Sequence, residues 1–153
     1  MSMTIRSSAF EQEGPIPSLH TCDGRNLSPP LSFDELPENT ATLTLIVDDP
    51  DAPVGVWVHW VAWNLPPVNG LAQGLPPEPT LPNGARQGRN DFGDLGWGGP
   101  CPPQGEAHRY YFRLYALDAP LRLQPGASRS ALEQHMAGHV LAQAQLIGRY
   151  VRR

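Results

Sequence analysis

The sequence has little charge, few cysteines and no long apolar run. Charged residues make up 17% of the 153 positions and the formal net charge is −4, so the basic surface typical of nucleic-acid binding is not expected. No segment approaches the ~20 consecutive apolar residues of a membrane-spanning helix. The first residues also lack the apolar centre of a signal peptide, and we therefore expect a cytoplasmic protein with no membrane span.

Cysteine is scarce, and Cys22 and Cys101 are the only two. In a cytoplasmic protein both would be reduced thiols. A disulfide between them stays open as an alternative, because the sequence gives no distance between the two residues.

Proline and glycine are abundant, with 18 and 15 residues respectively. This composition favours many turns, and the apolar runs between them are typical of β-strands. A chain of this length can bury the core of one domain. We therefore assign residues 1–153 to a single, mostly β domain with proline-stiffened connections.

Two runs of β-type residues predict the central strands of the domain. Leu43–Val47 is almost continuously apolar, which predicts a strand buried on both faces. Val56–Asn64 carries three of the four tryptophans and predicts a neighbouring strand. Shorter runs predict an edge strand within Met3–Phe10 and another strand at Leu31–Phe33.

The turn between the two central strands contains Asp49 and Asp51 among prolines. Proline fixes φ and restricts the residue before it, so this turn should hold its carboxylates in defined directions. His59 follows inside an apolar strand, where its ring needs a hydrogen-bond partner. We interpret these groups as a candidate site. The alternative is that the aspartates cap turns and His59 binds a backbone carbonyl.

A second polar group lies on the strand predicted at His108–Leu117. Side chains alternate between the two faces of a strand, so His108 and Tyr110 share one face. The alternative is that His108 only begins the strand while Tyr110 packs in the core. Before it, the glycine-rich stretch 83–105 either forms plain turns or presents backbone N–H groups near Gly99 to an anion.

The C-terminal part changes to a helical period. Ser130 followed by Glu133 is a capping-box pattern that predicts a helix start, and Gly138 fits its end. Beyond Gly138, apolar residues at Val140, Ala144, Ile147 and Val151 form a helical stripe. We therefore expect a terminal helix that packs on the sheets.

Several of these motifs together resemble the phosphatidylethanolamine-binding protein family, in its bacterial Raf-kinase-inhibitor-like branch. The resemblance rests on Asp49–Pro53, on His59-Trp60, and on Gly99–Gly105 leading into His108-Arg109-Tyr110. Thr21–Gly24, Ser28–Pro30 and Gly138–Ala142 also fit, so the similarity covers residues 20–150. It implies a two-sheet antiparallel Greek-key sandwich with a short C-terminal helical segment.

The resemblance also implies a pocket for phosphate-like or carboxylate ligands. Carried onto this sequence, its ligand-binding residues are Asp49, Asp51, His59, Gly99, Pro102, His108 and Tyr110. We expect Asp49 or Asp51 to accept a hydrogen bond from His59 and to hold its tautomer and charge. We assign no catalytic residue, no metal and no cofactor. His135 and His139 are four apart, but the sequence between them does not match a zinc-enzyme motif.

The resemblance favours a regulatory binding module for a phosphate or phospholipid head group, similar to kinase or protease inhibitors and without enzymatic activity. Kinase control is known of animal relatives and does not transfer on fold alone. The alternative is a hydrolase that uses the same His, Asp and Tyr side chains in acid–base or metal-assisted catalysis. A protein partner and a homodimer are further expectations of the same resemblance.

Overall fold

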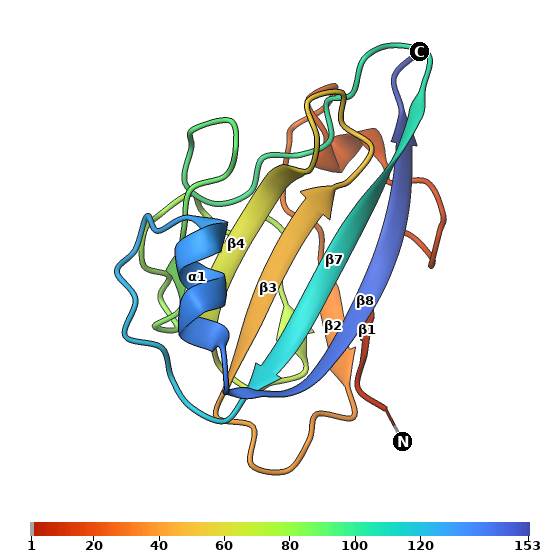
Figure 1. The fold of residues 1–153 in the computed structure, drawn as a ribbon. Coiled ribbons are helices and arrows are strands. Elements are labelled where there is room, and N and C mark those ends of the chain that lie inside the picture. Colours follow the sequence, from red (N-terminus) through yellow and green to blue (C-terminus); the bar gives the residue numbers. More distant parts are fainter. Residues whose placement is uncertain (1) are drawn as a thin grey trace.

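A computed structural model describes residues 2–153 and shows two antiparallel sheets (Figure 1). The larger sheet has the order β6-β4-β3-β7-β8 and the smaller has the order β1-β2-β5. The strands of the larger sheet are β3 (Thr42–Asp49), β4 (Trp57–Leu65), β6 (Arg86–Gln87), β7 (Ala107–Leu117) and β8 (Val140–Val151). Those of the smaller sheet are β1 (Thr4–Arg6), β2 (Leu31–Asp34) and β5 (Gly70–Leu71). The mostly β, two-sheet architecture predicted from the sequence is confirmed.

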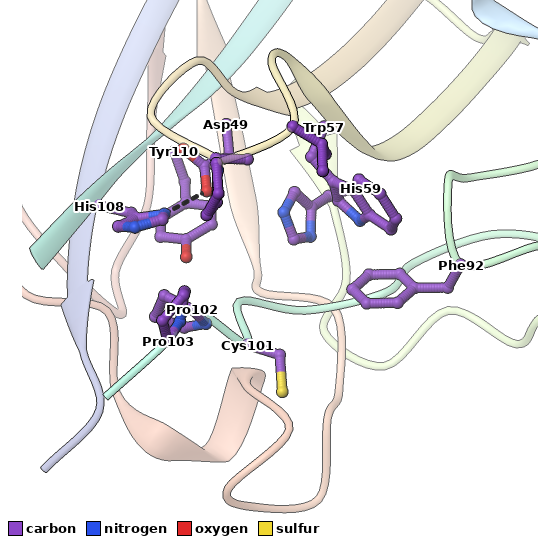
Figure 2. Close-up of a pocket in the computed structure, with 12 residues that line it drawn as sticks. Asp49, Trp57, His59, Phe92, Cys101, Pro102, Pro103, His108 and Tyr110 are labelled. Atoms are coloured by element: carbon purple, nitrogen blue, oxygen red, sulfur yellow. Dashed lines mark hydrogen bonds and ion pairs between the residues drawn. The ribbon is translucent and has the colours of Figure 1, made fainter. Parts of the chain in front are cut away.

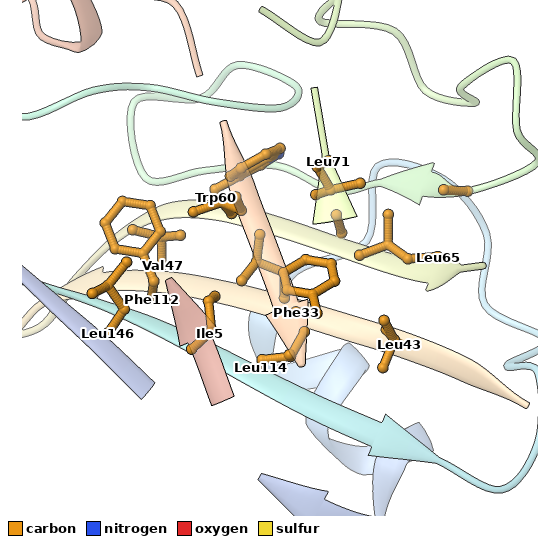
Figure 3. Close-up of a cluster of buried hydrophobic side chains, with 14 of the residues drawn as sticks. Ile5, Phe33, Leu43, Val47, Trp60, Leu65, Leu71, Phe112, Leu114 and Leu146 are labelled. Atoms are coloured by element: carbon orange, nitrogen blue, oxygen red, sulfur yellow. The ribbon is translucent and has the colours of Figure 1, made fainter. Parts of the chain in front are cut away.

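The main core lies between the two sheets. Figure 3 shows Ile5 of β1 and Phe33 of β2 facing side chains of the larger sheet. The inward side chains of β7 are the alternate residues Tyr110, Phe112 and Leu114, all buried. Alternation therefore predicted the inner face of β7 correctly, including the position of Tyr110.

The opposite face of the larger sheet is also covered. Helix α1 (Arg129–Met136) packs Leu132 against Ile46 of β3 and Trp63 of β4. Every residue of β3 is consequently buried, as the continuous apolar run predicted. A short 3-10 helix, η1 (Ser18–His20), precedes β2. Among residues 2–153, no helix is long and apolar enough to cross a membrane.

The expected terminal helix is wrong, because residues 140–151 form strand β8. This strand pairs antiparallel with β7 from Val140 to Val151. Its more protected residues alternate with exposed ones, so Leu146 and Gly148 are buried whereas Gln145 and Arg149 are exposed. The small and apolar side chains of this segment fit both periods, and the long unpaired edge of β7 favours the strand.

The helix does form, but it begins earlier than predicted. Ser128 is its N-cap, and its hydroxyl accepts a hydrogen bond from the Ala131 amide at 3.2 Å. The expected cap Ser130 instead lies within the first turn. Gly138 follows the helix with φ +84°, a left-handed conformation that glycine adopts without strain. This agrees with the predicted helix end.

Candidate functional site

A cavity of about 200 Å³ opens where β3 ends and where β4 and β7 begin (Figure 2). Its walls come from these three strands, from the β3–β4 loop and from two loops before β7. The lining residues are Asp49, Ala52, Pro53, Val54, Trp57, His59, Phe92, Cys101, Pro102, Pro103, His108 and Tyr110. Five of the seven residues predicted from the sequence therefore lie around one cavity, namely Asp49, His59, Pro102, His108 and Tyr110.

A β-bulge in β4 turns His59 toward this cavity. Val47 of β3 pairs with Trp60, whereas the next residue, Asp48, pairs with Val58, so His59 is an extra residue in the ladder. A bulge places two successive residues on one side of a sheet. His59 therefore faces the same side as Trp60, which lies in the core between the sheets.

His59 binds a backbone carbonyl, and the expected contact with Asp49 or Asp51 is wrong. Its Nδ1 lies 2.6 Å from the carbonyl oxygen of Gly98. A carbonyl oxygen only accepts, so Nδ1 carries the hydrogen and donates it. Burial lowers the pKa of the His59 ring, opposed by the Gly98 hydrogen bond. The ring is therefore neutral near pH 7, and its other nitrogen, Nε2, has a free lone pair.

The carboxylate pairs instead with the second imidazole. Oδ2 of Asp49 lies 2.7 Å from Nδ1 of His108, and both side chains are almost fully buried. The other Asp49 oxygen, Oδ1, accepts from the Asp51 amide at 2.7 Å, which fixes the carboxylate within its own turn. With Nδ1 directed at Asp49, Nε2 is the His108 atom left for a ligand.

The Tyr110 hydroxyl is buried and has no hydrogen-bond partner among the described residues. Figure 2 shows it pointing toward the Pro102 side of the cavity. Burial, together with the negative charges of Asp49 and Asp51, raises the pKa of Tyr110 well above its usual value, so the group stays a phenol. A buried donor without a partner is unfavourable, and a ligand that accepts its hydrogen would relieve this cost.

Asp51 does not reach the cavity and binds Arg109 of β7. Its oxygens accept from the Arg109 guanidinium at 2.8 and 2.9 Å and from the Arg109 amide at 2.9 Å. These hydrogen bonds lower the pKa of Asp51 to about 2. The two acids of one rigid turn thus point in different directions, and Asp51 ties the β3–β4 loop to β7.

Gly99 also lies outside the cavity lining. Its amide donates to the Asn26 side chain at 2.9 Å, and the Gly98 amide donates to the His59 carbonyl at 2.9 Å. Neither backbone donor is therefore free for an anion. A Cβ atom at Gly99 would lie 2.2 Å from the His20 carbonyl oxygen, so the close approach of two loops requires glycine here.

The expectation of two reduced thiols is wrong, because Cys22 and Cys101 form a disulfide. Their Cα atoms lie 5.4 Å apart, and the Cys22 amide also donates to the Pro100 carbonyl at 3.1 Å. The bridge joins the loop after η1 to the loop that carries Pro102. The wall of the cavity that contains Pro102 is therefore covalently fixed to the loop after η1.

Sequence reasoning missed most of the apolar rim. Trp57 and Phe92 pack edge to face with their ring centroids 5.4 Å apart, and Phe92 also contacts the His59 ring. Val54, in the β3–β4 loop, is 78% exposed at the mouth. Phe92 belongs to the glycine-rich stretch 83–105, whose composition indicates turns but no contacts, so only the folded chain brings it here.

Among residues 2–153, no group of three or more His, Cys, Asp or Glu side chains is arranged to hold a metal ion. The side chains that line the cavity offer hydrogen bonding by two imidazoles and one phenol, next to a buried carboxylate.

Known proteins resemble this chain in sequence and in fold. A sequence profile described as phosphatidylethanolamine-binding protein matches residues 6–151. A UPF0098 protein of Methanothermobacter thermautotrophicus is 54% identical over 151 residues, which cover 98% of this chain and 99% of that relative. A UPF0098 protein of Aquifex aeolicus is 45% identical over 98% of this chain and 89% of its own length.

Two solved structures share the fold. A phosphatidylethanolamine-binding protein homologue from Chlamydia trachomatis has a TM-score of 0.91 at 41% identity, covering 99% of both chains. YbcL of E. coli is described as a new member of the mammalian phosphatidylethanolamine-binding protein family. It has a TM-score of 0.92 at 32% identity over the whole of both chains. The fold implied by the sequence resemblance is thereby confirmed.

Proposed function

The chain belongs to the phosphatidylethanolamine-binding protein family, and from this premise we propose that its cavity binds the phosphate or carboxylate group of a small ligand. The protein acts as a regulatory binding module and not as an enzyme. Binding of the ligand, or of a protein side chain that carries such a group, then changes its association with a partner. We also propose that residues 1–153 form one domain.

The unpartnered hydroxyl of Tyr110 carries this proposal. It is a buried donor that faces a cavity, and the two imidazoles of His59 and His108 line the same space. An anionic oxygen that accepts from this hydroxyl satisfies it, and such charge-assisted hydrogen bonds contribute roughly 1.5–3 kcal/mol. Buried polar groups without partners often mark a site where a ligand completes the set.

The mouth of the cavity supports a ligand that also has an apolar part. Val54 and Phe92 are 78% and 43% exposed there, and both line the opening. Exposed apolar residues gathered at a pocket mouth are typical of an interaction site. We propose that the anionic group enters the cavity while an apolar portion, such as the carbon chain of an amphiphile, covers these side chains.

Isothermal titration calorimetry with inorganic phosphate, acetate and phenyl phosphate tests the proposal. Saturable binding that weakens in Tyr110→Phe supports it. Absence of binding for all three anions would overturn it. Light scattering on the same samples, with and without ligand, tests the expected homodimer and any change in association.

A hydrolase remains the second candidate, because the buried Asp49–His108 pair resembles a general base held by a carboxylate. Generic ester and phosphoester substrates, with and without added divalent metal, test this reading. Turnover that is lost in His108→Ala and His59→Ala would place the enzyme ahead of the binding module.

The expected location also stays a prediction. The disulfide favours an oxidising compartment over the cytoplasm that we expected from the sequence. Cell fractionation combined with thiol labelling of the native protein distinguishes these two.

A further inference from the structure

We propose that the cavity selects a phosphate monoester in its singly protonated form, because His59 accepts a hydrogen bond from the ligand's own P–OH group. This inference rests on the proposed function and names the class of anion that the same cavity prefers. A sulfate, a carboxylate or a phosphate diester has no such proton in its anionic form. The ligand therefore donates one hydrogen bond and accepts the others.

The tautomer of His59 leaves its Nε2 as a hydrogen-bond acceptor. Its Nδ1 is committed to the Gly98 carbonyl at 2.6 Å, and no described residue hydrogen-bonds its Nε2. The Gly98 amide in turn donates to the His59 carbonyl at 2.9 Å, so the contact is held from both sides. Nε2 of the neutral ring can only accept. An anion without a proton would place an oxygen lone pair against a nitrogen lone pair.

Protonation of His59 is the competing way to remove this clash, and its surroundings oppose it. The side chain is 2% exposed and packs against the rings of Phe92 and Tyr110 at 5.5 and 5.1 Å. The titratable or charged groups near it on β3, β7 and the loop after β6 are Asp48, Asp49, His108, Tyr110 and Asp91, of which Asp48 points its carboxylate to Arg113 and Arg129. The three carboxylates favour a charged ring, but burial outweighs them and lowers the pKa of His59.

The charge of the cavity lining favours a singly charged ligand. Of the described residues that line it, none is Arg or Lys, and the chain contains no lysine at all. The Asp49 carboxylate lies against Nδ1 of His108 at the cavity wall, and it is balanced there only when that ring carries a proton. Without a fixed cation, the cavity suits a monoanion better than a dianion. A singly protonated monoester meets both requirements, since it has one negative charge and one donor.

The remaining donors complete the arrangement. The Tyr110 hydroxyl has no partner among residues 2–153, and Nε2 of His108 is the free end of a ring whose Nδ1 binds Asp49. When His108 is protonated, both groups donate to the unprotonated oxygens of the ligand. These two contacts are the same for a phosphate and for a sulfate, so only the His59 contact distinguishes the two anions.

Phenyl phosphate and phenyl sulfate form a matched pair for the test. At about pH 5.5 most of the phosphate monoester is a monoanion, because its second pKa is about 6. Phenyl sulfate has the same charge and a similar shape but no proton. We expect calorimetry to give phenyl phosphate roughly ten- to a hundredfold tighter binding, the range for one buried group left unpaired. At about pH 8 this advantage should shrink.

Two variants separate the contacts. His59→Gln should bring the affinity ratio of the two anions close to one, whereas Tyr110→Phe should weaken both and leave the ratio unchanged. As a measurement on the unaltered protein, the ³¹P chemical shift of bound phenyl phosphate at about pH 7.5 should match the monoanion, although the free ligand is mostly a dianion there.

The outcomes are distinguishable. Equal affinities for the two anions, or tight sulfate binding accompanied by proton uptake, would defeat this inference and leave the proposed function intact. A ³¹P chemical shift typical of the dianion for bound phenyl phosphate would likewise defeat this inference and leave the proposed function intact. Failure of both anions to bind would refute this inference, and the proposed function would fall with it only if inorganic phosphate and acetate also failed to bind.

Discussion

Asp49 and His108 lie 59 residues apart in the chain and meet in a buried pair at 2.7 Å. The end of β3 supplies the acid and the start of β7 supplies the ring. Because β3 and β7 are hydrogen-bonded neighbours in the sheet, their ends lie at the same edge of the cavity. The pair fixes which nitrogen of His108 is free for a ligand.

Replacing Asp49 by Asn should weaken anion binding about tenfold or more, because His108 loses the buried carboxylate that fixes which of its two nitrogens faces the ligand. Calorimetric titration with inorganic phosphate measures this. Asp51→Asn is the matched control, since this acid in the same turn binds Arg109 outside the cavity. It should keep the affinity within about twofold while it lowers the stability by roughly 1–2 kcal/mol. An equal loss of affinity in both variants would show that the turn as a whole, and not the pair, is responsible.

Tyr110→Phe should stabilise the ligand-free protein by about 1 kcal/mol, because it removes a buried hydroxyl that no described residue hydrogen-bonds. Urea unfolding without added anion measures this free energy. Tyr115→Phe, on the same strand, is the control and should change it by less than about 0.5 kcal/mol. A clear destabilisation by Tyr110→Phe would mean that the hydroxyl is satisfied in the free protein.

The buried His59 should make the fold less stable in acid. Its folded pKa lies below the ordinary value of 6.5, so below this value the unfolded chain binds a proton that the folded chain does not. Each pH unit then lowers the free energy of unfolding by about 1.4 kcal/mol until the folded pKa is reached.

Urea unfolding between about pH 7.5 and pH 5 measures this slope. The His59→Gln variant has no titrating ring and should have a shallower slope, while the other histidines contribute equally to both proteins. Identical slopes would argue against the lowered pKa.

Reduction of the Cys22–Cys101 disulfide should lower the stability by about 2–4 kcal/mol, because the bridge closes a loop with a sequence separation of 79 residues. It should also weaken anion binding, since the bridge holds the loop that carries Pro102. Unfolding and titration with and without a dithiol reductant measure both effects. The double variant Cys22→Ser/Cys101→Ser serves as the control and should not respond to the reductant. If the reduced protein kept its affinity, the hydrogen bonds between the two loops would be sufficient to hold the wall.

The local pattern of the sequence determined several features of this protein. The continuous apolar run at Leu43–Val47 predicted a strand buried on both faces, and alternation placed His108 and Tyr110 on one face of β7. These follow from the sequence because the period of a strand and the composition of a buried segment are local properties. The motifs around His59 and Gly99 likewise indicated the family before any contact was known.

Tertiary structure decided which groups touch. The partner of His59 is a backbone carbonyl that lies 39 residues away, and the partner of Asp49 is His108, because a bulge and a loop approach set the directions of the side chains. Residues 140–151 are compatible with a helix or a strand by themselves, and pairing with β7 selects the strand. Likewise, the disulfide depends on two loops that meet only in the folded chain. Such choices depend on neighbours distant in sequence, so no local pattern contains them.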